Sequence, residues 1–226
     1  MRKVDADELE GACKVLGDTI LDPGVWPQAM DAISRAVGAR GAGLLQSDVR
    51  TPDVPRTAST DEMFTQYFRN NWHTRDIRAD RGVPLLLSGA SVVIDQDFLT
   101  PDEMRLDPMY NELFAPLDFQ WFAGVGFRAG SALWGLTIQR TVQDGPFEQR
   151  DKRLLSVLSQ RLTEVATLAT AVGRTALTSA TKRSIDLVSC WTQIASPTIC
   201  LIIAFRSGTN ASSSQMRKRE ARLKNC

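Results

Sequence analysis

The sequence predicts an α/β fold of the α+β type, in which an antiparallel sheet lies between helical layers and a long helix follows. Residues 119–127 and 132–140 are rich in aromatic, aliphatic and glycine residues and flank a glycine-containing turn, which is the pattern of an antiparallel hairpin. Residues 155–176 carry apolar side chains at a strict spacing of three and four, which predicts the long helix. With 43% apolar and 23% charged residues, the 226-residue chain has the composition of an ordinary globular protein.

Two amphipathic helices and a strand are predicted at the N-terminal end. Asp5 or Asp7 can cap a first helix, whose apolar residues recur every three or four positions until Pro23 approaches. A second helix includes Trp26 and stops at Gly38, because glycine readily adopts the left-handed backbone that ends helices. Residues 39–47 then predict a buried strand. The first eight residues lack the apolar run of a secretory signal, so we expect a cytoplasmic location.

The middle of the chain predicts a loop, two helices and a short strand. Residues 51–60 contain two prolines and are predicted as a loop, and Asp61 begins an aromatic helix that extends to residues 71–73. Residues 91–94 predict a short strand. Thr100 is predicted to cap a further helix with Pro101 at its first position, where the missing N–H of proline costs nothing.

An apolar seam runs along the long helix, which is predicted from Phe147 to about Ser179. Its members share the spacing by which two helices pair, and they are Leu155, Leu158, Leu162, Val165, Ala169 and Val172. The same spacing also suits packing on the chain's own sheet, and the sequence leaves both alternatives open. We expect the seam to combine packing with a dimer contact, and therefore expect a homodimer.

The C-terminal end differs from the rest of the chain in composition and charge. Residues 187–205 contain no charged residue and approach the length of a membrane span, although Pro197 and scattered polar residues disfavour insertion. After residue 205, six basic residues accompany one acidic residue, while the whole chain carries a net charge of only +1. Two alternative functions follow: a membrane-attached module anchored by residues 187–205, or a weak, non-specific nucleic-acid binder acting through the basic end.

Few residues of the chain suit catalysis or metal binding. His73 is the only histidine, whereas nucleophilic catalysis by serine or cysteine usually needs a base that a third group orients. The sequence contains no Gly-x-Ser-x-Gly motif and no phosphate-binding loop, and no two cysteines have the spacing of zinc ligands. We therefore expect no enzymatic activity, no catalytic residue, no metal site and no cofactor, and we expect membrane attachment to be absent.

Aromatic and polar residues in two regions indicate a small-molecule pocket. Such a pocket requires aromatic walls and a few fixed polar groups, and a carboxylate can accept a hydrogen bond from a ligand amide. The candidate ligand-binding residues are Tyr67, Trp72, Asp76, Trp121, Phe122 and Trp134. The alternative interpretation is that the aromatic residues fill a core and that Asp76 pairs with Arg75 or Arg78.

The order of these features resembles the N-terminal sensor domain of LuxR-type transcriptional regulators. The matching segments are residues 67–81, 107–114, 121–125, 134–140 and 145–155, within a resemblance that covers about residues 8–180. The resemblance implies a GAF/PAS-like, autoinducer-binding-like sandwich with a small-molecule pocket on one sheet face and dimerisation through helices. It also implies that Tyr67 and Asp76 are the family's aromatic residue and ligand-amide acceptor, and that Trp121 and Trp134 are pocket or sheet-face aromatics.

Two departures from this family affect what the resemblance implies. Acyl-homoserine-lactone receptors usually have Asp-Pro where this chain has Asp76 and Ile77, so the ligand is not identified. Nothing after Ser184 resembles the family's helix-turn-helix. We therefore expect a ligand-sensing domain at residues 1–146, a dimerisation helix at 147–180 and an atypical tail at 181–226. The expected protein is a sensor truncated or frame-shifted before its DNA-binding domain, so that only full-length relatives bind DNA.

Overall fold

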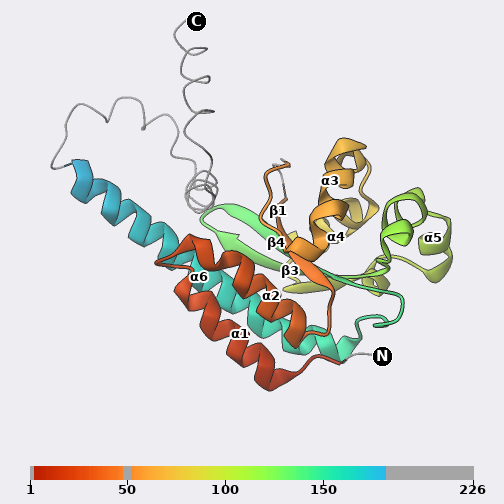
Figure 1. Ribbon diagram of the computed structural model, residues 1–226, viewed down its shortest axis with the longest axis horizontal. Coiled ribbons are helices and arrows are strands. Elements are labelled where there is room, and N and C mark those ends of the chain that lie inside the picture. The colour runs from red at the N-terminus through yellow and green to blue at the C-terminus, as the bar shows by residue number, and fades with distance from the viewer. Residues whose placement is uncertain (1–2, 48–51, 182–226) are drawn as a thin grey trace, which may run out of the picture.

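A four-stranded antiparallel sheet lies between two helical layers in the computed structural model, which describes residues 3–47 and 52–181 (Figure 1). The order of the strands across the sheet is β1-β4-β3-β2. Their bounds are β1 Gly41–Gln46, β2 Val92–Ile94, β3 Trp121–Ala129 and β4 Ala132–Arg140. This arrangement confirms the predicted fold class.

Strands β3 and β4 form the predicted hairpin at the centre of the sheet. Their register runs from Trp121 opposite Arg140 to Ala129 opposite Ala132, so the turn consists of Gly130 and Ser131. Gly130 has a φ of 64°, a left-handed conformation that glycine adopts at little cost. The short turn fixes which residues of the two strands face each side of the sheet.

One face of the sheet is covered by helices from both ends of the chain, α1 (Ala6–Asp18), α2 (Trp26–Ala36) and α6 (Gln149–Thr181) (Figure 1). Asp5 caps α1 as predicted, because its Oδ1 accepts hydrogen bonds from the backbone N–H groups of Asp7 and Glu8 at 3.0 Å. Apolar residues of the three helices and of the sheet together form one buried core.

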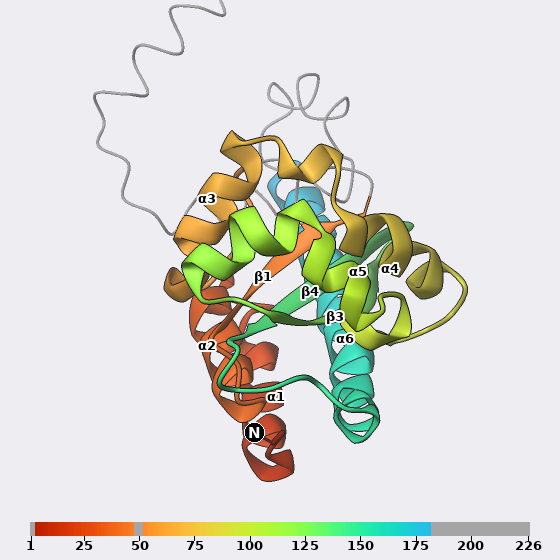
Figure 2. The same cartoon turned by 90° about the vertical axis from the view of Figure 1, so that its right-hand side faces the viewer.

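The opposite face of the sheet is covered by α3 (Asp61–Arg69), α4 (Ile77–Leu87) and α5 (Pro101–Leu106) (Figure 2). Thr100 caps α5 as predicted, and together with Glu103 it forms a capping box. Helix α4 was not predicted from the sequence. Shorter helical turns complete this layer and the connections, namely Pro23–Val25, Ala58–Thr60, Trp72–Thr74, Asp95–Asp97, Met109–Phe114 and Ala115–Leu117.

The first part of the predicted dimer seam lies inside the chain's own core. Leu155, Leu158 and Leu162 have no exposed surface and Val165 is 7% exposed, all within the core that α1 and α2 share with the sheet. This corrects their assignment to a dimer contact, because a partner helix cannot reach them. Ala169 is half-buried and Val172 is exposed.

The predicted anchor at residues 187–205 and the basic end lie outside the described residues. Among residues 3–47 and 52–181, no helix is both long enough and apolar enough to cross a membrane.

Candidate ligand-binding site

A cavity of about 80 Å³ lies between the sheet and the helices α3 and α4. Most of its wall is apolar. It includes buried side chains of these elements, namely Met63, Phe64, Val93, Phe122 and Leu133, and Phe114 from the helical turn Met109–Phe114. The cavity lies on the sheet face opposite to α6. Apolar walls with a few polar groups are typical of small-molecule sites.

Glycines on β3 and β4 bring the backbone of the sheet close to the cavity and to α4. A Cβ atom added at Gly126 would lie 3.0 Å from Leu86 Cδ2, so a larger residue there would require the Leu86 side chain to shift. A Cβ atom at Gly135 would meet only the Leu45 carbonyl oxygen, at 3.9 Å, and Gly135 lines the cavity. Gly135 is therefore a position at which side-chain volume can be added inside the cavity.

Tyr67 and Asp76, two of the predicted ligand-binding residues, meet at the cavity wall. The Tyr67 hydroxyl donates to Asp76 Oδ2 at 2.6 Å, and Asp76 Oδ1 accepts from the backbone N–H groups of Arg78 and Ala79 at 2.9 and 3.0 Å. Asp76 is thus the N-cap of α4, and it is separated from the end of the aromatic helix α3 at Arg69 by a short connection. Each carboxylate oxygen can accept more than one hydrogen bond, so a ligand N–H group in the cavity can share this buried carboxylate with its partners in the chain.

Arg78 reaches the cavity wall from α4 and is 5% exposed. Its Nε donates to the Tyr110 hydroxyl at 2.8 Å, its Nη1 to Gln139 Oε1 at 3.0 Å and its Nη2 to the Gln120 carbonyl oxygen at 3.0 Å. Asp95 Oδ1 lies 3.2 Å from Nε and supplies the opposite charge. The guanidinium is therefore held on several sides, and its orientation is fixed.

The Arg78 partners form a buried network of their own. The Tyr110 hydroxyl donates to Asp95 Oδ1, and the backbone N–H of Phe122 donates to Asp95 Oδ2 at 2.6 Å. Burial raises the pKa of Tyr110 well above its usual value, although Arg78 opposes this shift, and Asp95 raises the pKa further. The Tyr110 hydroxyl therefore remains a neutral hydrogen-bond donor throughout the physiological pH range.

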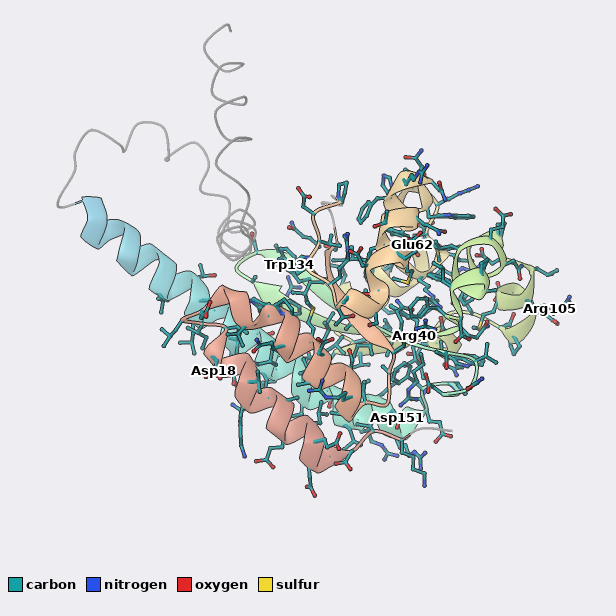
Figure 3. The ribbon with its side chains drawn as sticks, viewed as in Figure 1. Asp18, Arg40, Glu62, Arg105, Trp134 and Asp151 are labelled. Atoms are coloured by element: carbon teal, nitrogen blue, oxygen red, sulfur yellow. The ribbon has the colours of Figure 1, made fainter. Side chains whose placement is uncertain are left out.

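The remaining predicted site residues divide between the cavity and other places. Phe122 lines the cavity. Trp134, labelled in Figure 3, also borders the cavity, but it belongs to the buried core on the α6 face of the sheet, where it stacks on Phe127 with ring centroids 6.5 Å apart. Trp72 does not line the cavity, because it is buried beneath the Arg75 guanidinium, whose central carbon lies 3.9 Å from the ring centroid. Trp121 lines a separate surface groove.

The sequence interpretation missed the role of Arg78 and its network. Arg78 lies within the segment that predicted the pocket, but there it was considered only as a possible partner of Asp76. Its side-chain hydrogen-bond partners lie 32, 42 and 61 residues away in the chain, so no local spacing reveals them. Within residues 3–47 and 52–181, no group of three or more potential metal ligands comes together.

We find no family model and no curated protein that matches the chain. Among solved structures, the fold is similar to that of CepR2, an N-acylhomoserine-lactone-dependent LuxR family transcription factor from Burkholderia cenocepacia. The TM-score is 0.50 at 18% sequence identity, and the match covers 72% of this chain and 94% of the CepR2 chain. The chain therefore shares the fold of that protein.

Proposed function

We propose that this chain is the ligand-sensing domain of a LuxR-type transcriptional regulator. The observation that carries the proposal is the apolar cavity, which has the Tyr67–Asp76 pair and Arg78 in its wall and lies on the sheet face that α6 does not cover. The fold shared with CepR2, which is N-acylhomoserine-lactone-dependent, supports the same function. The proposal assigns no catalytic role to the site and keeps the expected cytoplasmic location.

The size and chemistry of the cavity limit what it binds. Drug-sized ligands occupy pockets of about 300–1,000 Å³, whereas this cavity measures about 80 Å³. A ligand as large as an acyl-homoserine lactone would need neighbouring side chains to move. Asp76 can accept a hydrogen bond from a ligand N–H group, while the aromatic and aliphatic walls cover the apolar part of the ligand.

The proposal retains a homodimer but moves its contact to the outer surface of α6. Val157, Leu168 and Val172 are large apolar residues of this helix that are exposed, unlike the first residues of the predicted seam. A dimer formed there would leave the cavity, on the other face of the sheet, open to a ligand.

Mass spectrometry of the purified chain, with no ligand added, tests the proposed function. We expect a co-purifying small molecule that is lost from Gly135→Leu, because the new side chain extends into the cavity. The matched control is Trp121→Phe, which changes an aromatic residue of the same hairpin outside the cavity and should retain the molecule. A molecule retained by Gly135→Leu and lost from Trp121→Phe would contradict the cavity as the site.

A further inference from the structure

A second hollow lies close to the cavity, on the surface of the helical layer that contains α5. This surface groove has a volume of about 400 Å³ and is lined by both polar and apolar residues. Its wall includes Leu99, Met104, Tyr110, Gln120 and Trp121. The groove is the place where the structure puts Trp121, a residue that the sequence predicted to bind the ligand.

The Arg78 side chain stands between the cavity and the groove. It lines the cavity, while its Nε and Nη2 donate to Tyr110 and Gln120, which line the groove. On the cavity side, its central guanidinium carbon lies 4.1 Å from the ring centroid of Phe114 and 5.0 Å from that of Phe122. Arg78, together with Tyr110 and Gln120, therefore separates the two hollows.

The guanidinium also retains hydrogen-bonding capacity toward a ligand. Arginine has five N–H groups, and three of them are directed at Tyr110, Gln139 and Gln120. Within residues 3–47 and 52–181 the structure shows no acceptor for the other two, and the side chain is only 4% exposed. A ligand carbonyl oxygen in the cavity can accept from this group, which folding has already removed from water.

The charges around Arg78 favour a neutral ligand over an anion. Asp95 and Asp76 both act electrostatically on Arg78, so two carboxylates surround one guanidinium. A ligand carboxylate would add a third negative charge to this buried group, whereas a ketone, ester or amide carbonyl adds none.

We propose that Arg78 determines the specificity of the ligand site by closing the cavity off from the groove and by binding the carbonyl oxygen of a compact, neutral ligand. This inference rests on the proposed ligand-sensing function. An engineered cavity of about 150 Å³ accommodates benzene, so the roughly half-sized cavity here holds a group of about three or four heavy atoms. Longer ligands bind only when the Arg78 side chain moves away.

A homologous series of methyl ketones, from acetone to 2-undecanone, tests the size limit in the full chain. We expect the wild-type protein to bind the shortest ketones, with affinity that stops rising once the ketone exceeds about four heavy atoms. Carboxylic acids of equal length should bind at least about tenfold more weakly than the ketones at pH 7. Ligand-detected NMR titration measures both.

A charge-balanced double variant, Arg78→Ala with Asp95→Asn, should remove the closure without leaving a buried unpaired carboxylate. The amide that Asp95→Asn introduces would still accept from the Phe122 N–H through its oxygen, while its NH₂ group donates to the Tyr110 oxygen. In this variant we expect affinity to rise about fourfold for each further methylene, which is the increment for burying one CH₂ group. The terminal methyl of a long ketone should then show a nuclear Overhauser contact to the Trp121 indole.

The control is Arg81→Ala, which removes an exposed arginine of the same helix that pairs with Glu103 and should leave the wild-type size limit unchanged. If the double variant does not fold, Arg78→Gln with Asp95→Asn provides a smaller opening and should extend the limit by a few carbons. If long ketones bind wild type as tightly as the variant, the proposed closure by Arg78 is wrong, while the sensor function is unaffected. Acids that bind as well as ketones would overturn the assigned ligand chemistry. Failure of the sensor function is detected separately, by the Gly135→Leu and Trp121→Phe comparison.

Discussion

Arg140 is the most buried charged residue that the structure describes, with no exposed surface. Its Nε and Nη2 donate to the Val37 carbonyl oxygen at 3.2 and 2.5 Å, and its Nη1 lies 3.4 Å from Asp151 Oδ2. Nη1 also donates to the Pro146 carbonyl oxygen at 3.1 Å. Burial lowers the pKa of Arg140, and the neighbouring Asp151 opposes that shift. One side chain of β4 thus connects the end of α2 to the beginning of α6.

Replacing Arg140 by methionine should lower the free energy of unfolding by about 3–5 kcal/mol, because the buried Asp151 would lose its buried partner and keep only the 3.8 Å contact with Arg150. Urea unfolding followed by circular dichroism measures the change. Arg150→Met is the matched control, since Arg150 is about half-exposed and its ion pairs should contribute less than about 1 kcal/mol. Equal losses for the two variants would show that the buried pair does not stabilise the fold.

Glu103 provides a pH-dependent contribution to stability at the residue scale. The backbone N–H of Thr100 donates to its carboxylate at 2.8 Å, and Arg81 Nη1 donates at 2.8 Å, as does the Thr100 hydroxyl at 3.0 Å. The Thr100 backbone hydrogen bond, followed by the bonds from Arg81 and the Thr100 hydroxyl, lowers the pKa of Glu103 from 4.5 to about 2. Folding therefore favours the ionised carboxylate, and its stabilisation is complete above pH 4.5 and is lost as the pH falls toward 2.

An NMR titration of the Glu103 side-chain carboxyl carbon should show its inflection near pH 2. In the Glu103→Gln variant, the part of the unfolding free energy that changes between pH 4.5 and pH 2 should be smaller than in wild type. Thr100→Val keeps the backbone donor and removes only the hydroxyl, so it should raise the pKa part of the way. An inflection near the ordinary glutamate value would contradict the capping-box contribution.

At the element scale, segments with strong local signals were predictable from the sequence. Asp5 before α1, Gly38 after α2 and the glycine turn between β3 and β4 each act through a few neighbouring residues. Helix α4 lacks such a signal, because Gly82 and Pro84 both disfavour a helix interior. The sequence interpretation also assigned Asp76 to ligand binding and did not recognise that its carboxylate caps α4. Tertiary contacts with the sheet and with the Arg78 network supply what local propensity does not.

Two glycine-to-alanine substitutions, one inside α1 and one directly after α2, should have opposite effects on the stability of the protein. Gly11 lies within α1 with no heavy atom near its added Cβ, so Gly11→Ala should stabilise the protein by about 0.5–1 kcal/mol. Gly38 follows α2 with a φ of 60°, so Gly38→Ala should destabilise it by about 1 kcal/mol or more. Thermal and urea unfolding of both variants measure the difference, and a stabilising effect at Gly38 would contradict the left-handed helix end.

On the scale of the whole molecule, the sheet separates a packing face from a binding face. The three covering helices α1, α2 and α6 make one face a continuous apolar core, and the small residues of β3 and β4 leave the cavity on the other. The apolar spacing in α6 predicted a buried seam but could not show what buries it, because a partner helix and the chain's own sheet require the same spacing. The site was predictable only in part for a related reason: Tyr67 and Asp76 are close in sequence, whereas the Arg78 network joins segments far apart.

The proposed dimer can be tested by changing the outer surface of α6. Leu168 is 52% exposed and lies between Val157 and Val172, which are 55% and 43% exposed. Sedimentation equilibrium of the full chain should give the mass of two chains for wild type and the mass of one chain for Leu168→Lys. The reason is that a lysine charge is costly to bury in an apolar contact. Val142→Lys, a change to an exposed valine that lies outside α6, should remain dimeric. A wild-type protein that is monomeric at all concentrations, or a Leu168→Lys variant that stays dimeric, would contradict a dimer formed through this surface.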